Sequence, residues 1–189
     1  VIHYLFNSGI WAYFDRLGVA AGMTAERAGT ILGPGMAASI VGMIAASVLG
    51  DRWGYLRPIY LGVAAIVAST LALLGTPSEL VFGVGTALFN ASISFVAPYM
   101  VAMLAVLVPS GMGVTAANIG MVTGFAAGPF LISFLVADGD FTSALIVTAA
   151  GFVVSGILFL LYRQRLVREP GLDRLKSLCL GSPSDPLRA

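Results

Sequence analysis

The chain has 189 residues, of which 58% are hydrophobic and only 10% are charged, and its formal net charge is +1. Soluble domains carry about 25% charged residues, so this composition excludes a water-soluble protein and predicts an integral membrane protein in contact with the lipid bilayer. A nucleic-acid-binding protein needs a basic patch or stripe, and a net charge this close to zero gives no sign of one.

Six continuous apolar runs are long enough to cross a bilayer as helices, which takes about 20 residues. They cover residues 1–21, 28–49, 58–75, 79–108, 113–136 and 142–162. Strands of a membrane barrel would alternate polar and apolar residues, whereas these runs do not alternate. The sequence therefore predicts an all-α integral membrane protein, a six-transmembrane-helix bundle over residues 1–163.

Short polar segments separate the runs, and short connections make successive helices antiparallel neighbours. Thr24 stands just before Glu26, which predicts a helix N-cap followed by an acid that suits the helix dipole. Pro58 falls in the first turn of the third helix, where its missing N–H group costs nothing.

Lys and Arg side chains set the predicted orientation. With six spans, the turn after the second helix lies on the same side as residues 164–189. That side holds Arg52, Arg57, Arg163, Arg165, Arg168, Arg174, Lys176 and Arg188, and the opposite side has only Arg27. The positive-inside rule places the basic side in the cytoplasm. We expect both termini there, in a plasma or bacterial inner membrane, with residues 164–189 as a disordered basic tail.

The turn between the second and third helices is the most charged short segment, and we expect it to act as a conformational loop. It is formed by Asp51, Arg52, Gly54 and Arg57, with Ser47 four positions before Asp51. An Asp beside a helix start can accept from unpaired N–H groups and meet the positive end of the dipole. The alternative is an ordinary turn whose arginines contact headgroups.

Two helices carry small residues at four-residue spacing, which gives a smooth face for close helix packing. The fifth has Gly120, Gly124 and Gly128, followed by Pro129. The second has a similar face formed by Gly35, Ala38 and Gly42, at steps of three and four. Neither face has an obvious mate elsewhere in the chain.

The turn resembles the signature loop of the major facilitator superfamily, although Ser47 replaces its first Gly and Leu56 one of its closing Arg residues. The Gly124-x-x-x-Gly128-Pro129 element resembles the Gly-Pro motif of the same superfamily. With the order of the helices, these motifs make residues 4–163 similar to the C-terminal six-helix half of such a transporter. The chain opens on Val1 inside an apolar run, so we expect a fragment or a start codon read as valine.

The resemblance implies secondary active transport of a small solute by alternating access, with no enzymatic activity and no cofactor. The partner would be a missing N-terminal half or a second copy, meeting this half along its second and fifth helices. The first and fourth helices would line the substrate pathway. In the first, Trp11 and Asp15 share one stripe, and an intramembrane acid is a candidate site by default, here for proton or cation coupling. The alternative places Asp15 at the interface or against a structural partner.

The fourth helix carries a second polar stripe that points to the same pathway. Thr86, Asn90 and Ser94 recur at steps of four, and Pro98 and Tyr99 follow. Because polar residues in a membrane helix face a cavity or another helix, interhelical hydrogen bonding is the alternative. Asn90, Ser94 and Tyr99 complete the candidate pathway, which could suit an aromatic, sugar-like or amphiphilic solute.

Two other functional classes compete with transport. An intramembrane serine protease needs a Ser–His pair, and His3 is the only imidazole in the chain, at its very start. A standalone six-helix channel or structural protein acting as a homodimer is the stronger alternative, although no selectivity-filter pattern is visible. No phosphate-binding Gly-Lys loop supports ATP-driven pumping. Cys179 is alone, so neither a disulfide nor a Cys-based metal site is predicted.

Overall fold

The computed structural model describes residues 1–107, 112–136 and 139–168, and all regular structure in these ranges is helical except for one isolated bridge residue. The helices are α1 (Ile2–Trp11), α2 (Phe14–Ala20), α3 (Ala25–Leu49), α4 (Leu56–Ala72), α5 (Glu79–Leu107), α6 (Met112–Ser133) and α7 (Thr142–Arg168). Within the described ranges, α3, α5, α6 and α7 are long and apolar enough to cross a membrane, and α4 is apolar but shorter. The predicted all-α membrane bundle is confirmed, whereas six crossings remain a prediction.

The first predicted span is not one helix. It is divided into α1 and α2 by a break at Ala12 and Tyr13, where Tyr13 has the non-helical dihedrals φ −116° and ψ 3°. The Tyr13 amide donates to the carbonyl of Ile10 at 3.0 Å, which is the tighter three-residue spacing of a 3₁₀ turn. The continuous helix predicted over residues 1–21 is therefore wrong, because one tight turn interrupts the α-helical ladder between Trp11 and Phe14.

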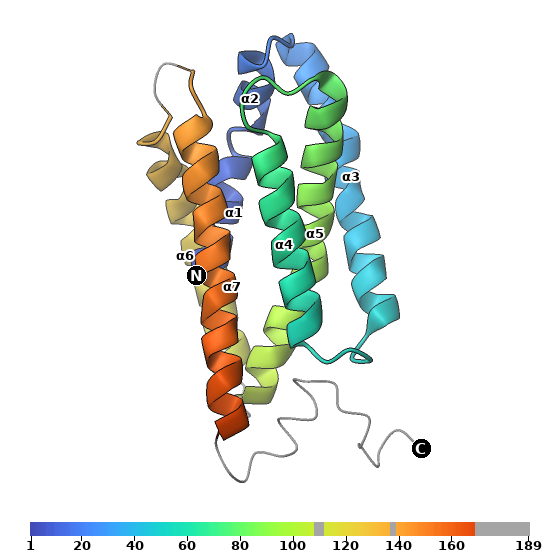
Figure 1. Ribbon diagram of the computed structural model, residues 1–189, viewed down its shortest axis with the longest axis vertical. Helices are drawn as coiled ribbons and strands as arrows, with labels where there is room; N and C mark the ends of the chain where they lie inside the picture. Colours follow the sequence, from blue (N-terminus) through green and yellow to red (C-terminus); the bar gives the residue numbers. More distant parts are fainter. Residues whose placement is uncertain (108–111, 137–138, 169–189) are drawn as a thin grey trace.

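The bundle has two distinguishable ends (Figure 1). The turn between α3 and α4 lies at the same end as the C-terminal end of α7, whereas α2 and the connection between α4 and α5 lie at the other. This agrees with the prediction that the charged turn and the end of the last helix share a side. The predicted tail begins inside α7, which ends at Arg168, and its remainder lies outside the described residues.

Two pairs of parallel helices form the framework: α3 packs against α5, and α1 packs against α6. In the first pair, Gly35 lies beside Thr86 and Gly42 lies beside Ala91, so both helices run in the same direction. In the second pair, the contacts likewise advance along both chains. They join Gly120 to Val1, Gly124 to Tyr4 and Leu5, and Gly128 to Leu5, Ser8 and Gly9. Of the other helices, α4 packs against α5 and α7, α7 also packs against α1, and α2 packs against α3.

The two glycine faces therefore have mates within the chain, contrary to the expectation that they lacked one. A Cβ added at Gly42 would overlap the carbonyl oxygen of Ala91, and one added at Gly124 would lie 2.8 Å from the Leu5 amide nitrogen. Such short distances mean that the backbones approach closely only because no side chain intervenes. The sequence revealed the small faces but not the helices that they contact.

An aromatic series runs through the middle of the bundle and connects four helices. Phe14 of α2 packs edge-on against Phe89 of α5 with ring centroids 5.2 Å apart, and Phe89 packs against Phe152 of α7 at 6.0 Å. His3 of α1 meets the Phe152 ring at 5.1 Å. Edge-to-face contacts at these separations are favourable beyond the area that they bury, so the series fixes α1, α2, α5 and α7 relative to one another.

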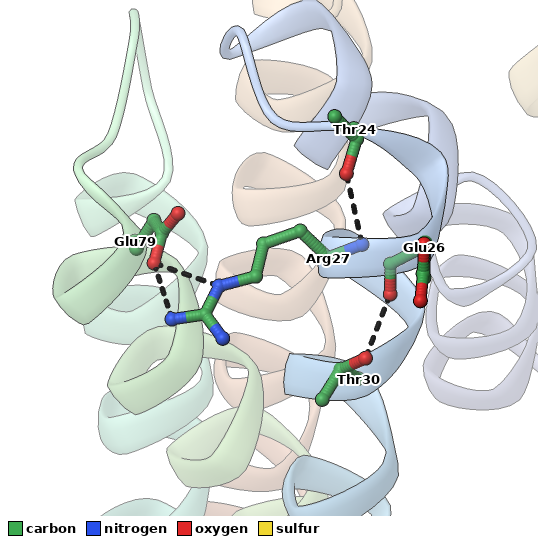
Figure 2. Close-up of polar contacts among 5 residues, drawn as sticks. All are labelled: Thr24, Glu26, Arg27, Thr30 and Glu79. Atoms are coloured by element: carbon green, nitrogen blue, oxygen red, sulfur yellow. Dashed lines mark hydrogen bonds and ion pairs between the residues drawn. The ribbon is translucent and has the colours of Figure 1, made fainter.

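Local hydrogen bonds define two helix starts, and the sequence predicted the first of them. Thr24 caps α3, because its hydroxyl accepts from the Arg27 amide at 3.2 Å, and Figure 2 shows this contact. Before α7, Asp140 accepts from the Thr142 amide at 2.8 Å. Hydrogen bonds from the side chain and the backbone of Thr142 lower the pKa of Asp140 below its usual value.

An exposed ion pair joins α3 and α5 near their N-terminal ends (Figure 2). The Arg27 guanidinium donates through Nε at 3.0 Å and Nη2 at 2.7 Å to one oxygen of Glu79. Both side chains are more than half exposed, so water and salt screen their attraction. The pair lies near the N-terminal ends of two helices whose close packing comes from Gly35 and Gly42.

We expect Arg27→Gln to lower the melting temperature only slightly, and only at low salt. At about 1 M NaCl the Debye length falls to about 3 Å, so the variant and the wild type should melt together. The charge-swapped double variant, Arg27→Glu with Glu79→Arg, should recover the low-salt difference. A large loss of stability that persists in high salt would contradict this minor role.

Candidate functional site

The break between α1 and α2 places two predicted pathway residues at one surface hollow. Trp11 ends α1, and Asp15 lies in the first turn of α2. Both side chains are exposed, with 45% of Trp11 accessible. The hollow has a volume of about 290 Å³ and is lined by Trp11, Ala12, Phe14, Asp15, Leu32 and Met36. It lies between the broken first span and α3.

The Asp15 carboxylate has no cationic partner among the residues that the structure describes. The neighbouring Arg16 lies over the ring of Tyr13, with its guanidinium carbon 5.5 Å from the ring centroid. Arg27, the other arginine near this end of the bundle, pairs with Glu79 and not with Asp15. The structure therefore does not support the alternative of a structural ion pair for Asp15, whose carboxylate instead lines the hollow beside Trp11.

The other pathway residues do not join Asp15 in either hollow that it lines. The second such hollow, of about 440 Å³, contains Arg16, Val19, Ala20, Ala25, Val136, Gly139 and Phe141. Asn90 is buried and donates from Nδ2 to the Thr86 carbonyl of its own helix at 2.8 Å. Ser94 is half-buried. Asn90, Ser94 and Tyr99 thus lie along α5, away from the lining of the Asp15 hollows.

The polar stripe of α5 mostly satisfies its own helix. The Thr86 hydroxyl donates to the carbonyls of Phe82 at 2.8 Å and Gly83 at 3.2 Å, and Asn90 also bonds within α5. Interhelical hydrogen bonding, the alternative for this stripe, does not describe Thr86 or Asn90. It does describe Tyr99, whose hydroxyl donates to the Ala46 carbonyl of α3 at 3.0 Å.

A side-chain hydroxyl group forms a hydrogen bond across each of the two parallel helix pairs. Tyr99 joins α5 to α3 through Ala46, and Ser8 joins α1 to α6 by donating to the Gly124 carbonyl at 3.0 Å. Both bonds are buried. Because buried hydrogen bonds between membrane helices contribute on average about 0.6 kcal/mol, we regard them as modest additions to the glycine packing.

Removing either hydroxyl should have a small and measurable effect. We expect Tyr99→Phe and Ser8→Ala each to reduce unfolding free energy by about 0.5–1 kcal/mol, since neither change creates a steric conflict. Tyr99→Phe also retains the ring contact with Phe95. Reversible unfolding in mixed detergent micelles would measure both values. Because the two bonds lie in different helix pairs, the double variant should show additive losses.

His3 is a buried polar residue that the sequence analysis set aside. It is 4% exposed, and neither ring nitrogen has a hydrogen-bond partner among the described atoms. It lines a hollow of about 490 Å³ that α5, α6 and α7 complete, with Ser155 as another buried polar member. Only the assembled bundle places His3 beside Phe152 and Ser155, so no local sequence signal identifies this environment.

The charged turn has the backbone geometry that a tight reversal requires. Gly54 has φ +69° and is buried, and its amide donates to the Asp51 carbonyl at 2.8 Å. Gly50, the C-cap of α3, has φ +54°. Positive φ favours glycine, which has no Cβ. The side chains of Asp51, Arg52 and Arg57 are exposed at this end of the bundle.

The helix contacts follow a repeated pattern when the chain is divided before α5. The broken first span, α3 and α4 then correspond to α5, α6 and α7. The contact of α3 with α5 corresponds to that of α6 with α1, and the contact of α4 with α5 corresponds to that of α7 with α1. The contact between α2 and α3 likewise matches that between α5 and α6. Two three-helix repeats therefore exchange their first helices.

A family model described as the Major Facilitator Superfamily matches residues 1–180. The chain belongs to the major facilitator superfamily. It is therefore a member of a superfamily of membrane transporters. The resemblance to this superfamily that the sequence indicated is confirmed. Nested three-helix repeats within a six-helix half are a known feature of these transporters, which agrees with the exchange of first helices. Neither the curated proteins nor the solved structures contain a match to the chain.

Proposed function

We propose that the chain is a six-helix half, the C-terminal one, of a secondary active transporter that moves a small solute by alternating access. The observation that carries this proposal is the paired helix pattern. Two three-helix repeats, joined by parallel contacts of α3 with α5 and α1 with α6, match the internal organisation of a half-transporter. Membership of the superfamily over residues 1–180 supports the same conclusion.

The working transporter would require a second six-helix half, supplied by an N-terminal half or by a second copy. The faces of α3 and α6 opposite their glycines support the proposal of a second half. Each carries large exposed apolar side chains. They are Met36, Ile40, Val41, Met43 and Ile44 on α3, and Ile119, Val122, Phe125 and Phe130 on α6. We propose that the two halves meet along these helices, with lipid covering the rest.

The turn at Asp51 would act at the cytoplasmic side of this half. Exposed Arg52 and Arg57 would contact headgroups or the facing half as the halves rock. The buried Gly54 allows the tight turn between α3 and α4. This turn would therefore move together with both helices. Asp15 would lie toward the opposite end, beside the broken first span, where coupling to a proton or a cation would take place.

Alternating access can be tested by cysteine labelling in sealed vesicles. Ala12 lines the hollow beside Asp15, so Ala12→Cys in a Cys179→Ala background reports access to it. The protein would be the polypeptide of the whole reading frame that contains this chain. We expect a membrane-impermeant maleimide to label the site from one side at a time, at a rate that transported solute changes. Thr76→Cys, in the exposed connection before α5, should be insensitive to solute.

Solute counterflow separates transport from the channel or structural alternative. A transporter exchanges labelled for unlabelled solute across the vesicle membrane faster than net flux, whereas a channel does not. The reading frame before Val1 settles the partner: about six further spans would supply the first half, and their absence would require a dimer. Labelling of Ala12→Cys that ignores every solute tested, without counterflow, would overturn the proposal.

A further inference from the structure

We propose that the hollow between the broken first span and α3 binds a monovalent organic cation with a compact apolar body. This inference rests on the proposed function, because it names the substrate class of that transporter. Three features carry it: an unpaired carboxylate at Asp15, the indole of Trp11, and apolar walls from Phe14, Leu32 and Met36.

The charge of the ligand follows from what lines the hollow. Asp15 is its only charged member, and no basic side chain contributes to it. Arg16, next in sequence, is held over Tyr13 and, with Asp15, lines the other hollow but not this one. The exposed Asp15 carboxylate has no cationic partner in this hollow, so it would attract a bound cation. An anionic solute would meet the opposite effect.

The shape of the ligand follows from the walls. An exposed indole attracts a cation over its face more strongly than any other aromatic side chain does, and Trp11 stands one helical turn from Asp15 across the break. Phe14, Leu32 and Met36 offer only apolar surface, which suits the carbon body of an amine. Binding pockets for small molecules have volumes of roughly 300–1,000 Å³. The hollow, at about 290 Å³, lies at the lower end of this range and therefore suits a small ammonium ion.

A proton alone would not need this arrangement. Protonation of Asp15 requires a carboxylate and access to water, and neither Trp11 nor the wall opposite it on α3 contributes to that chemistry. The side chains from α3, Leu32 and Met36, are useful only to a ligand with apolar surface. We therefore assign the hollow to an organic cation, with proton binding at Asp15 as a competing reaction at the same oxygen atoms.

Phenyltrimethylammonium and its uncharged isostere tert-butylbenzene provide the test, because they differ in charge and hardly in shape. The purified full chain in phosphatidylcholine nanodiscs presents no anionic lipid to attract the cation. We expect equilibrium dialysis to show saturable binding of radiolabelled phenyltrimethylammonium, and neither benzoate nor tert-butylbenzene should displace it. Tetramethylammonium, which has the charge without the ring, should displace it at higher concentration.

Matched variants locate the site. Asp15→Asn should weaken binding about tenfold or more, because it keeps the shape and removes the charge. Trp11→Leu should weaken it about threefold. Glu26→Gln removes an exposed carboxylate at the start of α3 that does not line the hollow, and should leave binding unchanged. Equal melting temperatures would show that each variant is folded.

Two outcomes would overturn the inference: no saturable binding of the cation, or binding that Asp15→Asn leaves unchanged. Its failure is distinguishable from failure of the proposed function. Counterflow of a neutral or anionic solute without cation binding would overturn only the substrate class. Saturable, Asp15-dependent binding without any counterflow would leave the cation site standing and overturn the transporter.

Discussion

Gly42→Ala is expected to destabilise the protein by more than any surface substitution, although it adds only one methyl group. The new Cβ would overlap the carbonyl oxygen of Ala91 in α5 and lie 2.8 Å from its carbonyl carbon. Ordinary overpacking costs about 1–3 kcal/mol because side chains can shift. Here the obstacle is the backbone of a neighbouring helix, so α3 and α5 must separate and the cost should exceed that range.

Gly29→Ala is the matched control on the same helix. A Cβ at Gly29 meets nothing within 4 Å, and Ala is favoured over Gly inside a helix by up to about 1 kcal/mol. We expect Gly29→Ala to melt at or above the wild-type temperature, and Gly42→Ala well below it, with a loss of monodisperse protein in detergent. Similar melting temperatures for the two variants would mean that α3 and α5 do not pack as described.

Most helices could be predicted because the membrane leaves the chain little choice. A backbone in hydrocarbon must satisfy its own hydrogen bonds, so an uninterrupted apolar run such as residues 79–108 has only one available structure. The observed α5, Glu79–Leu107, begins where predicted. The cap at Thr24 could be predicted for a similar reason, since its hydroxyl acts on a backbone amide only three residues away.

The break at Ala12 and Tyr13 could not be predicted in this way. No Pro or Gly stands there, and the predicted apolar run continues across it. The structure instead holds Tyr13 by tertiary contacts: its hydroxyl donates to the Pro129 carbonyl of α6 at 3.4 Å, and its ring lies near Phe141. These partners are more than one hundred residues away in sequence, so local periodicity carries no trace of them.

The candidate site likewise has one part that local spacing predicts and one part that depends on tertiary contacts. The stripe of Trp11 and Asp15 could be identified from spacing, and both residues line one hollow. The other contacts of Asn90 and Tyr99 could not be identified from spacing, because the acceptor of each hydrogen bond is set by the tertiary structure. Asn90 bonds within α5, whereas Tyr99, nine positions later, reaches the Ala46 carbonyl in α3. Polarity in a membrane helix predicts that a partner exists, but not which one.

Gly128→Ala should be about as damaging as Gly42→Ala, and no second substitution should rescue it. A Cβ at Gly128 would overlap the carbonyl oxygen of Leu5 as well as the Ser8 hydroxyl, and would lie 2.8 Å from the Gly9 amide nitrogen. Removing the hydroxyl by Ser8→Gly leaves both backbone conflicts in place. The double variant Gly128→Ala with Ser8→Gly should therefore melt no higher than Gly128→Ala alone.

Gly151→Ala in α7 is the informative comparison, because the three atoms nearest to the new Cβ all belong to the ring of Phe6. A side chain can be shortened without moving a helix, so Phe6→Leu should relieve the conflict. We expect the double variant Gly151→Ala with Phe6→Leu to melt above Gly151→Ala, which is a favourable coupling between neighbours. Thermal unfolding of these four variants, and of Ser8→Gly and Phe6→Leu alone, in one detergent measures both couplings. Rescue at Gly128 but not at Gly151 would mean that α6 tolerates a shift against α1 and that α7 does not.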